Sequence, residues 1–426
     1  MKKLSNKILA GLAMTAATLT AAPTAQAGWQ QIYSLPTAYA HFITSEGIHL
    51  MSDYRDNRDG GIYYSEDKCV TWTKTEVRDY SFSGFYEADG YVFAIGSGCR
   101  IGRSEDGGRT WDLLNYSQAV KGWVPEKALD ETVCYAITAL DGVLYAGDFS
   151  GGGILRSEDY GETWEMTDRE SLYIHFQGDP NDYMDNFYRL EAFKGKVYAF
   201  GLYSVHAYVP EEKKWEVLPI NSNCLGSVTV MDGIMYCGRA TTNYNTETEY
   251  LLASDGEQWG VVNRPDTDDN NVRALGNDGK YIFSMHHGGP MYYSDSMGES
   301  WGVADGLPNG LYPLTVASDD DYVYTAVYSP IPSEKKSGLW RLPKSELQST
   351  GIVAVESDKE STVRFDGTSL LIGSEAKSVS VMRPDGREVF TASNVSVVDL
   401  STLPAGIYVY SVDNGSRRSN GKIVKR

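Results

Sequence analysis

A loop signature that returns at a nearly regular interval is the feature that most limits how this chain can fold. Each full copy begins with Ser, carries Asp or Ser two residues later and ends with Trp. Four full copies and one shortened copy are present: Ser65–Trp72, Ser104–Trp111, Ser157–Trp164, Ser294–Trp301 and the shorter Ser254–Trp259. Repeats of roughly 20–50 residues indicate solenoids or propellers, because a single unit cannot bury its apolar face alone.

The residues of this signature are those of a tight turn. Ser and Asp side chains can hydrogen-bond to the backbone of their own loop, which makes them frequent turn formers. Gly108, Gly161 and Gly298 stand where we expect a positive φ. The first copy has Cys69 and Val70 without a glycine, so we expect it to be strained or differently shaped. Each Trp should begin a strand and bury its ring between sheets. The residues with this structural role are Ser65, Asp67, Trp72, Ser104, Asp106, Trp111, Ser157, Asp159, Trp164, Ser294 and Trp301.

The signature resembles the Asp-box, or BNR repeat, of the sialidase-like and Vps10-like propeller families. The resemblance implies a β-propeller and says little about function. Sialidases of this group have six blades, an arginine triad and a tyrosine nucleophile, and Asp-box xyloglucan hydrolases place carboxylates between two propellers. The chain lacks an early arginine motif of the sialidase kind and has repeats for one propeller. We therefore assign no catalytic residue from the resemblance.

A second repeat gives the number of blades. A turn, often Asp-Gly, precedes a short strand rich in Tyr, Val and Ile, which is a strong hairpin signal. Seven such units are present: Gly47–Met51, Gly90–Ala94, Gly142–Ala146, Gly195–Ala199, Gly233–Cys237, Gly279–Phe283 and Asp321–Thr325. The sequence therefore predicts an all-β fold, with a seven-bladed β-propeller of four-stranded blades over residues 28–345.

The outer strand of the last blade is expected to come from the other end of the propeller segment. Six outer strands are marked by a tryptophan: Trp72, Trp111, Trp164, Trp215, Trp259 and Trp301. The seventh unit ends at Gly338–Leu342 with no such strand after it, and Gly28–Pro36 resembles the strand at Trp215. We expect Gly28–Pro36 to pair with the last blade, because closing the ring removes exposed sheet edges.

Residues 1–27 have the pattern of an export signal. Lys2, Lys3 and Lys7 precede a short apolar stretch, and Ala25–Ala27 is a small-x-small cleavage site, so we expect mature protein to begin at Gly28. The apolar stretch is too short for a membrane span, and no later segment is long and apolar enough for one. We expect an exported chain without a transmembrane segment after processing.

Residues 350–426 differ from the rest in composition. Short alternating strands with Asp-Gly and Pro-Ala-Gly turns predict a small immunoglobulin-like β-sandwich. The run Asp399–Tyr408 followed by Gly421–Lys425 is similar to the C-terminal sorting domain of the type IX secretion pathway. That resemblance implies the type IX machinery as a partner and delivery to the cell surface or medium. The alternative is an ordinary immunoglobulin-like accessory module.

Charge and cysteine content exclude some partners and sites. The chain has 57 acidic and 38 basic residues, a formal charge of −19, which disfavours a nucleic-acid partner. Its five cysteines include no C-x-x-C pair, so neither a zinc ribbon nor a thioredoxin-like site is supported. Cys224 and Cys237 flank one predicted hairpin and are the best candidates for a disulfide.

Long, unequal loops mark the candidate ligand-binding surface. Their aromatic, acidic and amide side chains suit sugar rings and also suit protein interfaces. The residues assigned to ligand binding are Arg55, Trp123, Tyr173, Asp182, Tyr183 and His286, the last because it follows an inner strand and should look into the channel. We assign no metal site, because adjacent histidines such as His286 and His287 point to opposite faces of a strand.

These observations favour a non-catalytic, exported binding propeller for a glycan or protein ligand. The alternative is a single-propeller glycoside hydrolase or polysaccharide lyase, with acids among Asp179, Asp182 and Asp185. No cofactor is expected. Two oxygen-rich segments, Asp53–Asp59 and Asp266–Asn270, are weak candidates for calcium, and neither has the glycine and distal Glu of an EF-hand loop.

Overall fold

The computed structural model describes most of the chain after residue 27. The described residues are 28–35, 38–53, 60–78, 80–148, 153–175, 182–220, 225–239, 251–262, 272–286, 290–308, 310–348, 350, 363–365, 368–383, 387–404, 406–415 and 418–425. Contacts divide the chain into two units, Met1–Gln348 and Ser349–Arg426. The predicted signal peptide lies outside the described residues.

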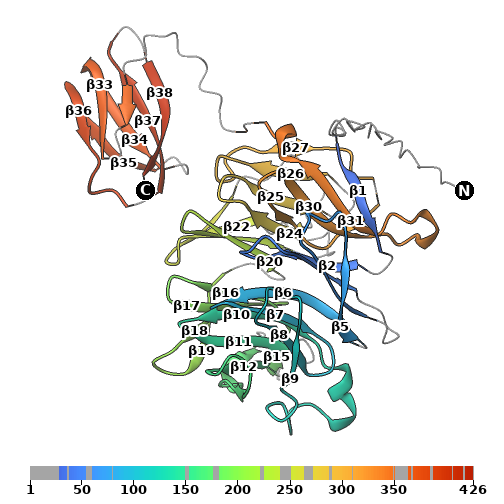
Figure 1. The fold of residues 1–426 in the computed structure, drawn as a ribbon. Coiled ribbons are helices and arrows are strands. Elements are labelled where there is room, and N and C mark those ends of the chain that lie inside the picture. The colour runs from blue at the N-terminus through green and yellow to red at the C-terminus, as the bar shows by residue number, and fades with distance from the viewer. Residues whose placement is uncertain are drawn as a thin grey trace, which may run out of the picture. The chain divides into compact units, whose positions relative to one another are not determined.

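Six sheets of the first unit each contain four antiparallel strands in chain order (Figure 1). The first is β2 (Ala38–Ile43), β3 (His49–Asp53), β4 (Gly61–Ser65) and β5 (Thr73–Arg78). The second is β6 (Phe82–Ala88), β7 (Tyr91–Gly96), β8 (Arg100–Ser104) and β9 (Asp112–Asn115). The third is β10 (Cys134–Leu140), β11 (Val143–Asp148), β12 (Gly153–Ser157) and β13 (Glu165–Met166). The fourth is β16 (Phe187–Phe193), β17 (Lys196–Gly201), β18 (Val205–Val209) and β19 (Lys214–Val217). The fifth is β20 (Leu225–Met231), β21 (Ile234–Arg239), β22 (Leu251–Ser254) and β23 (Trp259–Val261), and the sixth is β24 (Val272–Asn277), β25 (Ile282–His286), β26 (Met291–Ser294) and β27 (Gly302–Ala304).

A further sheet joins the two ends of the first unit. It contains β28 (Tyr312–Pro313), β29 (Ala317–Ser318), β30 (Tyr322–Tyr328) and β31 (Gly338–Pro343), and its outer strand is β1 (Gln30–Ser34). β1 runs antiparallel to β31, with Ser34 opposite Gly338 and Gln30 opposite Arg341. Both views show the blue β1 beside the orange β31. The prediction that the segment at Trp29 closes the last sheet is confirmed.

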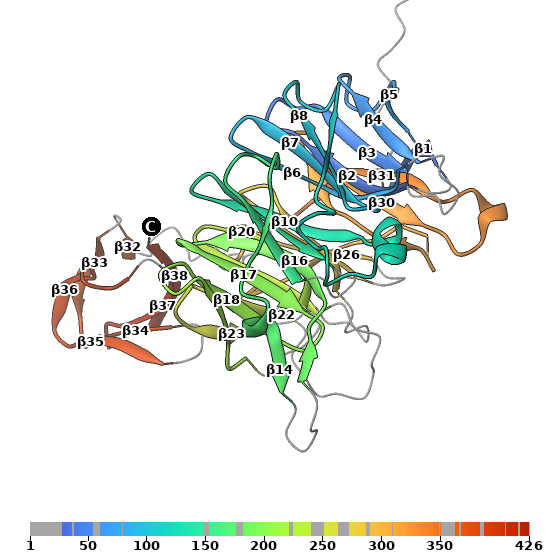
Figure 2. The same cartoon turned by 90° about the horizontal axis from the view of Figure 1, so that it is seen from below.

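The innermost strands of successive sheets touch one another around the unit. β2 contacts β6, β6 contacts β10, and the series continues through β16, β20 and β24. β24 then contacts β28 and β29, and β30 contacts β2, which completes the circuit (Figure 2). The apolar core lies between neighbouring sheets: Phe93 of β7 and Leu144 of β11, for example, belong to one buried cluster. The predicted all-β propeller is confirmed.

The antiparallel order gives this propeller two different ends. One end carries the turns between first and second strands and the loops between third and fourth strands, and we call it the short-turn face. The loops there that carry the repeated Ser-to-Trp signature are called Asp-box loops below, after the resemblance noted above. The other carries the connections between sheets and between second and third strands, and we call it the long-loop face. Its longest fully described connection is 116–133, which contains the 3-10 helix η1 (Glu126–Glu131). The connection 167–186 contains the 3-10 helix η2 (Glu170–Leu172) and the hairpin of β14 (Tyr173–His175) and β15 (Asp182–Met184).

The Asp-box loops on the short-turn face hold themselves together by internal hydrogen bonds. In the second loop, Ser104 Oγ donates to Asp106 Oδ1 (2.8 Å), and the N–H of Gly108 donates to Ser104 Oγ (2.8 Å). The N–H and hydroxyl of Thr110 donate to the two Asp106 oxygens (2.8 and 2.6 Å). The third loop repeats this pattern around Ser157 and Asp159. In the loop after β26, Ser296 replaces Asp and accepts from the N–H of Ser300 (3.0 Å).

The first Asp-box loop has the same backbone conformation as the others but lacks their glycine at the second of its two left-handed positions. Its hydrogen bonds are the same, with the N–H of Cys69 donating to Ser65 Oγ (3.0 Å). Lys68 and Cys69 adopt φ values of 56° and 68°, in the left-handed region that favours glycine. The expected strain is therefore present without a change of hydrogen-bonding pattern.

Two expectations about side chains need correction. The Asp-box tryptophans Trp72, Trp111, Trp164 and Trp301 are half-buried and each stands one residue before its strand, rather than buried at the strand's start. The indole N–H of Trp111 donates to the Gly108 carbonyl (2.9 Å), so the ring stays at the loop. Cys237 is a buried free thiol, so the expected disulfide with Cys224, a residue outside the described part, is not found.

The second unit consists of two sheets around one apolar core. One sheet contains β32 (Val363–Phe365), β33 (Ser369–Ala376) and β36 (Val395–Asp399), and the other contains β35 (Glu388–Ala392), β34 (Ser378–Met382), β37 (Gly406–Asp413) and β38 (Arg418–Lys425). Leu370 and Val398 of the first sheet and Val381 and Tyr408 of the second belong to the same buried cluster. This is the predicted β-sandwich. In the described part of the whole chain, no helix has the length and apolar character needed to span a membrane.

Candidate ligand-binding face

The inner strand of each of the first six sheets has a β-bulge near its start, at the long-loop face. In β10, for example, Cys134 lies opposite Asp148 and Ala136 opposite Gly147, which leaves Tyr135 as the extra residue. The same shift occurs at the start of β2, β6, β16, β20 and β24. Bulges redirect side chains and are common beside functional sites.

The second residue of each of these strands is partly exposed, and it follows a buried residue in every case. These residues are Tyr39, Ser83, Tyr135, Tyr188, Gly226 and Arg273. Arg273 also stacks on Tyr312 at the start of the last sheet, with the guanidinium 5.8 Å from the ring centroid. The six inner strands and β28 thus bring four tyrosines and an arginine to the same end of the propeller.

A second aromatic group lies on the two longest described connections of this face. The guanidinium of Arg169 stacks on Trp123, 4.7 Å from the ring centroid, and on Tyr173 at 5.2 Å. Arg169 Nη1 also donates to the Tyr173 hydroxyl (2.6 Å). Trp123 remains 49% exposed. A guanidinium between two aromatic rings keeps its charge and has fewer rotamers to lose when a ligand binds.

Both connections are anchored to the propeller beneath them. Val120 and Val124, on either side of Trp123, are buried in the cluster shared by the second and third sheets. On the other connection Leu172 is fully buried, and the hydroxyl of Ser171 accepts from the N–H of Trp215 in β19 (2.9 Å). The exposed indole of Trp123 is therefore held in place by buried residues on both sides of it in the chain.

The long-loop face also holds the exposed aromatic residues of the described chain. Eight large hydrophobic side chains are exposed, and three of them are aromatic: Trp123, Tyr203 and Tyr328. Tyr203 follows β17, and Tyr328 ends β30, so all three lie at this end of the propeller. Exposed aromatic side chains gathered on one face are typical of a binding surface.

Asp185, one of the acids considered for catalysis, is fully buried in a shell of donors. Its Oδ1 accepts from the N–H groups of Asn186 and Leu202 (both 2.8 Å), and its Oδ2 accepts from the N–H and hydroxyl of Ser204 (2.9 and 2.6 Å). Burial raises the pKa of Asp185, while these donors act in the opposite direction. The carboxylate ties the connection before β16 to the turn after β17 and does not face a ligand.

Ser204 also contacts His206, which places Asp, Ser and His side chains in one buried network. Ser204 Oγ lies 2.7 Å from His206 Nε2, and burial lowers the pKa of His206 to about 4. In a catalytic triad the histidine stands between the serine and the carboxylate. Here Ser204 stands between Asp185 and His206, and all three residues are buried. This order does not activate a nucleophile.

The structure brings together two of the six predicted ligand-binding residues, Trp123 and Tyr173, through Arg169. Arg55 lies outside the described residues, as do the side chains of Asp182 and Tyr183, although their backbones form β15 opposite β14. His286 was expected to look into the channel, but it is fully buried in β25, bonded to Ser284 (3.0 Å) and stacked edge-on against Tyr292. Sequence reasoning missed Arg169 and the bulge residues.

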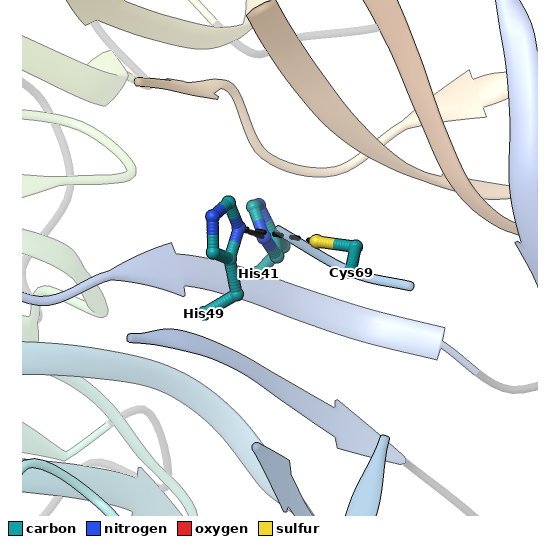
Figure 3. Close-up of side chains that lie close together, drawn as sticks. All are labelled: His41, His49 and Cys69. Atoms are coloured by element: carbon teal, nitrogen blue, oxygen red, sulfur yellow. Dashed lines mark hydrogen bonds between the residues drawn. The ribbon is translucent and has the colours of Figure 1, made fainter. Parts of the chain in front are cut away.

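One group of residues in the described chain could hold a metal ion, and it lies away from the long-loop face. His41, His49 and Cys69 are buried, and their ligand atoms all lie within 4.8 Å of one another (Figure 3). His41 comes from β2, His49 from β3 and Cys69 from the first Asp-box loop.

Comparison with known proteins supports the fold. No protein-family model and no curated protein matches the chain. Among solved structures, YCF48 from Cyanidioschyzon merolae matches with a TM-score of 0.50 and 17% identity, over 75% of this chain and all of that one. YCF48 bound to D1 peptide matches with a TM-score of 0.52 and 14% identity, over 75% and 98% of the two chains. The extracellular domain of BT4673 from B. thetaiotaomicron matches with a TM-score of 0.51 and 12% identity, over 94% of this chain but only 59% of that one.

Proposed function

We propose that this protein is a non-catalytic, exported binding propeller that holds a polypeptide or glycan ligand on its long-loop face. The observation that carries the proposal is the convergence of aromatic and arginine side chains there. The bulges at the inner strands bring three tyrosines and Arg273 to this end, and β28 adds Tyr312. Trp123, Arg169 and Tyr173 stack on the adjoining connections.

These side chains suit the proposed ligands for physical reasons. Tyr, Trp and Arg are the residues that most often dominate binding energy at protein interfaces. Aromatic faces also stack on sugar rings, and tyrosine hydroxyls and guanidinium groups bond to hydroxyls and carbonyls. Among the structural relatives, YCF48 binds a peptide and the BT4673 domain is extracellular, which supports a binding role for a propeller of this kind.

We further propose that the seven sheets are the complete set of blades of an Asp-box propeller. The hydrogen bonds of Asp67, Asp106 and Asp159 within their loops support a structural role for these carboxylates. Residues 1–27 serve as the signal peptide, and residues 350–426 serve as a type IX sorting domain. Deleting residues 350–426 should abolish delivery to the cell surface or medium. Unchanged delivery of the truncated chain would leave this unit as an accessory module.

A screen for binding and turnover tests the proposed function. Purified residues 28–426 are tested on a displayed library of random peptides, on a glycan array, and against polysaccharides with detection of released ends. We expect binding on one of the first two and no turnover. Product release abolished by a single Asp→Asn change on the long-loop face would favour the glycoside hydrolase or lyase instead.

Variants of the stacked group locate the binding surface. Trp123→Ala should weaken binding of the selected ligand by about 2 kcal/mol, a roughly 30-fold loss of affinity, which is typical of a central aromatic contact. Arg169→Lys should also weaken binding, because an ammonium group cannot stack on two rings as a guanidinium does. Val70→Ala is the control, since Val70 is also exposed (77%) but lies in the first Asp-box loop, on the short-turn face.

A further inference from the structure

Three potential metal ligands converge in the interior of the first sheet. His49 Nδ1 lies 3.2 Å from His41 Nε2 and 3.1 Å from Cys69 Sγ. Figure 3 shows the two imidazole rings and the thiol turned toward one another. All three residues are buried, with exposures of 4% for His41, 1% for His49 and 4% for Cys69.

The fold itself brings these residues together. His41 lies opposite Met51 in the β2–β3 ladder, so it is a diagonal neighbour of His49 on the same face of the sheet. His49 lies opposite Ser65, the first residue of the Asp-box loop. Ser65 in turn accepts the hydrogen bond from the N–H of Cys69 and so holds the thiol over His49.

Hydrogen bonding alone leaves this group poorly satisfied. His49 Nδ1 makes both short contacts, yet an imidazole nitrogen has either one proton or one lone pair to offer. The other nitrogen of His41, Nδ1, has no hydrogen-bond partner within the described residues.

The backbone conformation of Cys69 also supports a role for its thiol in this cluster. The other full Asp-box loops have glycine at this place, with positive φ values at Gly108 (98°), Gly161 (93°) and Gly298 (85°). Cys69 has φ 68°, which costs free energy that glycine would not cost. Only Cys69 brings a side chain to this place, and that side chain ends beside two histidines.

We propose that His41 Nε2, His49 Nδ1 and Cys69 Sγ bind a divalent transition-metal ion, of which Zn²⁺ is the best match. One thiolate and two neutral imidazoles form a donor set typical of Zn²⁺, which prefers nitrogen and sulfur ligands in tetrahedral order. Tetrahedral donors at usual zinc distances stand roughly 3.3–3.6 Å apart, close to the two contacts measured here. On binding, the Cys69 thiol loses its proton to solvent, and both imidazoles keep theirs on the outer nitrogens.

A carboxylate stands behind the proposed ligand His49. Asp319 Oδ2 lies 3.8 Å from His49 Nε2, and it accepts a hydrogen bond from the Tyr324 hydroxyl (2.7 Å). A carboxylate on the outer nitrogen of a ligating histidine favours the tautomer that leaves the inner nitrogen free to bind. The Tyr324 ring also packs against both imidazoles, with ring centroids 5.3 Å from His41 and 4.9 Å from His49.

The proposed site lies where the first and last sheets of the propeller meet. Tyr324 belongs to β30 of the last sheet, and Asp319 lies in the turn just before β30. Cys69 shares a buried cluster with Leu35, Tyr324 and Leu339. A metal ion bound by the folded state alone stabilises that state in proportion to the logarithm of its free concentration. We therefore expect the ion to stabilise the contact between the first and last sheets, where the ring closes.

The experiment uses purified residues 28–426, unfolded in denaturant with a chelator and refolded with or without Zn²⁺ or Co²⁺. Elemental analysis after dialysis should find about one Zn²⁺ per chain. Co²⁺ should give the thiolate-to-metal charge-transfer absorption that a cysteine ligand produces. The thermal midpoint should rise with free Zn²⁺ and fall again with chelator. Protein that refolds without bound metal and shows the same midpoint with and without Zn²⁺ would overturn the proposal.

Three variants assign the ligands. Cys69→Gly restores the residue of the other Asp-box loops, so it should fold well without metal yet lose the charge-transfer band and the Zn²⁺-dependent midpoint. His49→Gln should lose tight binding while keeping a polar side chain at the site. Cys237→Ala is the control, because it removes a buried thiol of the fifth sheet and should bind Zn²⁺ as the unchanged protein does. Equal binding by Cys69→Gly and the unchanged protein would contradict the assignment.

Discussion

Gly338 of β31 lies so close to Tyr33 of β1 that a Cβ atom at position 338 would stand 2.0 Å from the Tyr33 carbonyl oxygen. Gly338 also has φ +135°, a conformation that other residues rarely adopt. The closing strand can therefore dock only against a glycine. We expect Gly338→Ala to lower the free energy of unfolding by about 2–4 kcal/mol, as judged by urea denaturation.

The matched control for this substitution is Gly260→Ala. Gly260 lies in β23, in the middle of a short strand, and a Cβ atom there would meet nothing within 4 Å. It should change stability by less than about 1 kcal/mol. If the two alanine variants unfold at the same urea concentration, the close docking of β1 on β31 is not what stabilises the ring.

The Asp-box carboxylates should make stability depend on acid pH. Hydrogen bonds from the side chain and N–H of Thr71 and from Ser65 lower the pKa of Asp67 to about 2. The pKa of Asp106 and of Asp159 is lowered too, since bonds from their own loops outweigh the opposing effect of burial. A carboxyl group with a lowered folded-state pKa stabilises fully above its unfolded pKa of about 4 and loses that contribution as the pH falls toward 2.

Substitution of the three carboxylates tests this dependence. The triple variant Asp67→Asn, Asp106→Asn, Asp159→Asn should be less stable than the unchanged protein at pH 6, and the difference should shrink between about pH 4 and pH 2. Thermal midpoints measured across that range give the comparison. A difference that stays constant with pH would show that the charge of these groups does not contribute.

Asp185 should behave as a structural residue. Asp185→Asn replaces one acceptor oxygen by an NH₂ group that must face the N–H donors of the surrounding loop, so we expect a loss of about 2–4 kcal/mol. Gly201→Ala should be comparably harmful, because its Cβ would lie 2.2 Å from an Asp185 oxygen. Asp112→Asn, at a carboxylate that is 75% exposed, should stay within about 0.5 kcal/mol. Chemical denaturation of the three variants provides the measurement, and an unchanged midpoint for Asp185→Asn would contradict the role.

The sequence predicts the propeller well because its repeats have local causes. Asp-Gly turns and Ser/Asp loops adopt their conformations through bonds within a few residues, and so they recur visibly in each unit. The closing strand at Trp29 was also predictable. Six of the seven repeat units are followed by an outer strand marked by a tryptophan, and the seventh, which ends at Gly338–Leu342, is not. A signal for the bulge residues exists as well: Ser83, Tyr135, Tyr188 and Gly226 each stand six residues before a turn residue with positive φ, at Asp89, Asp141, Lys194 and Asp232.

The residues that sequence reasoning missed depend on contacts between distant segments. Arg169 is one arginine in a long connection, and only the packing of two connections shows that it stacks on Trp123. His41 and His49 have no metal-ligand spacing with Cys69, because a turn and a strand pairing bring them together. The one local clue was the cysteine that stands where the other Asp-box loops have glycine. His286 was expected to face the channel, but it is buried at the end of β25. Its position in the sequence does not indicate whether its side chain is buried or faces the channel.

The central claim is that the long-loop face is the binding surface, and hydrogen–deuterium exchange of the chain with its selected ligand tests it most directly. Saturating ligand should slow exchange in the connections 116–133 and 167–175 and at the starts of the inner strands. The Asp-box loops of the short-turn face should exchange as in the free protein. Slowed exchange confined to the short-turn face or to residues 363–425 would contradict the claim.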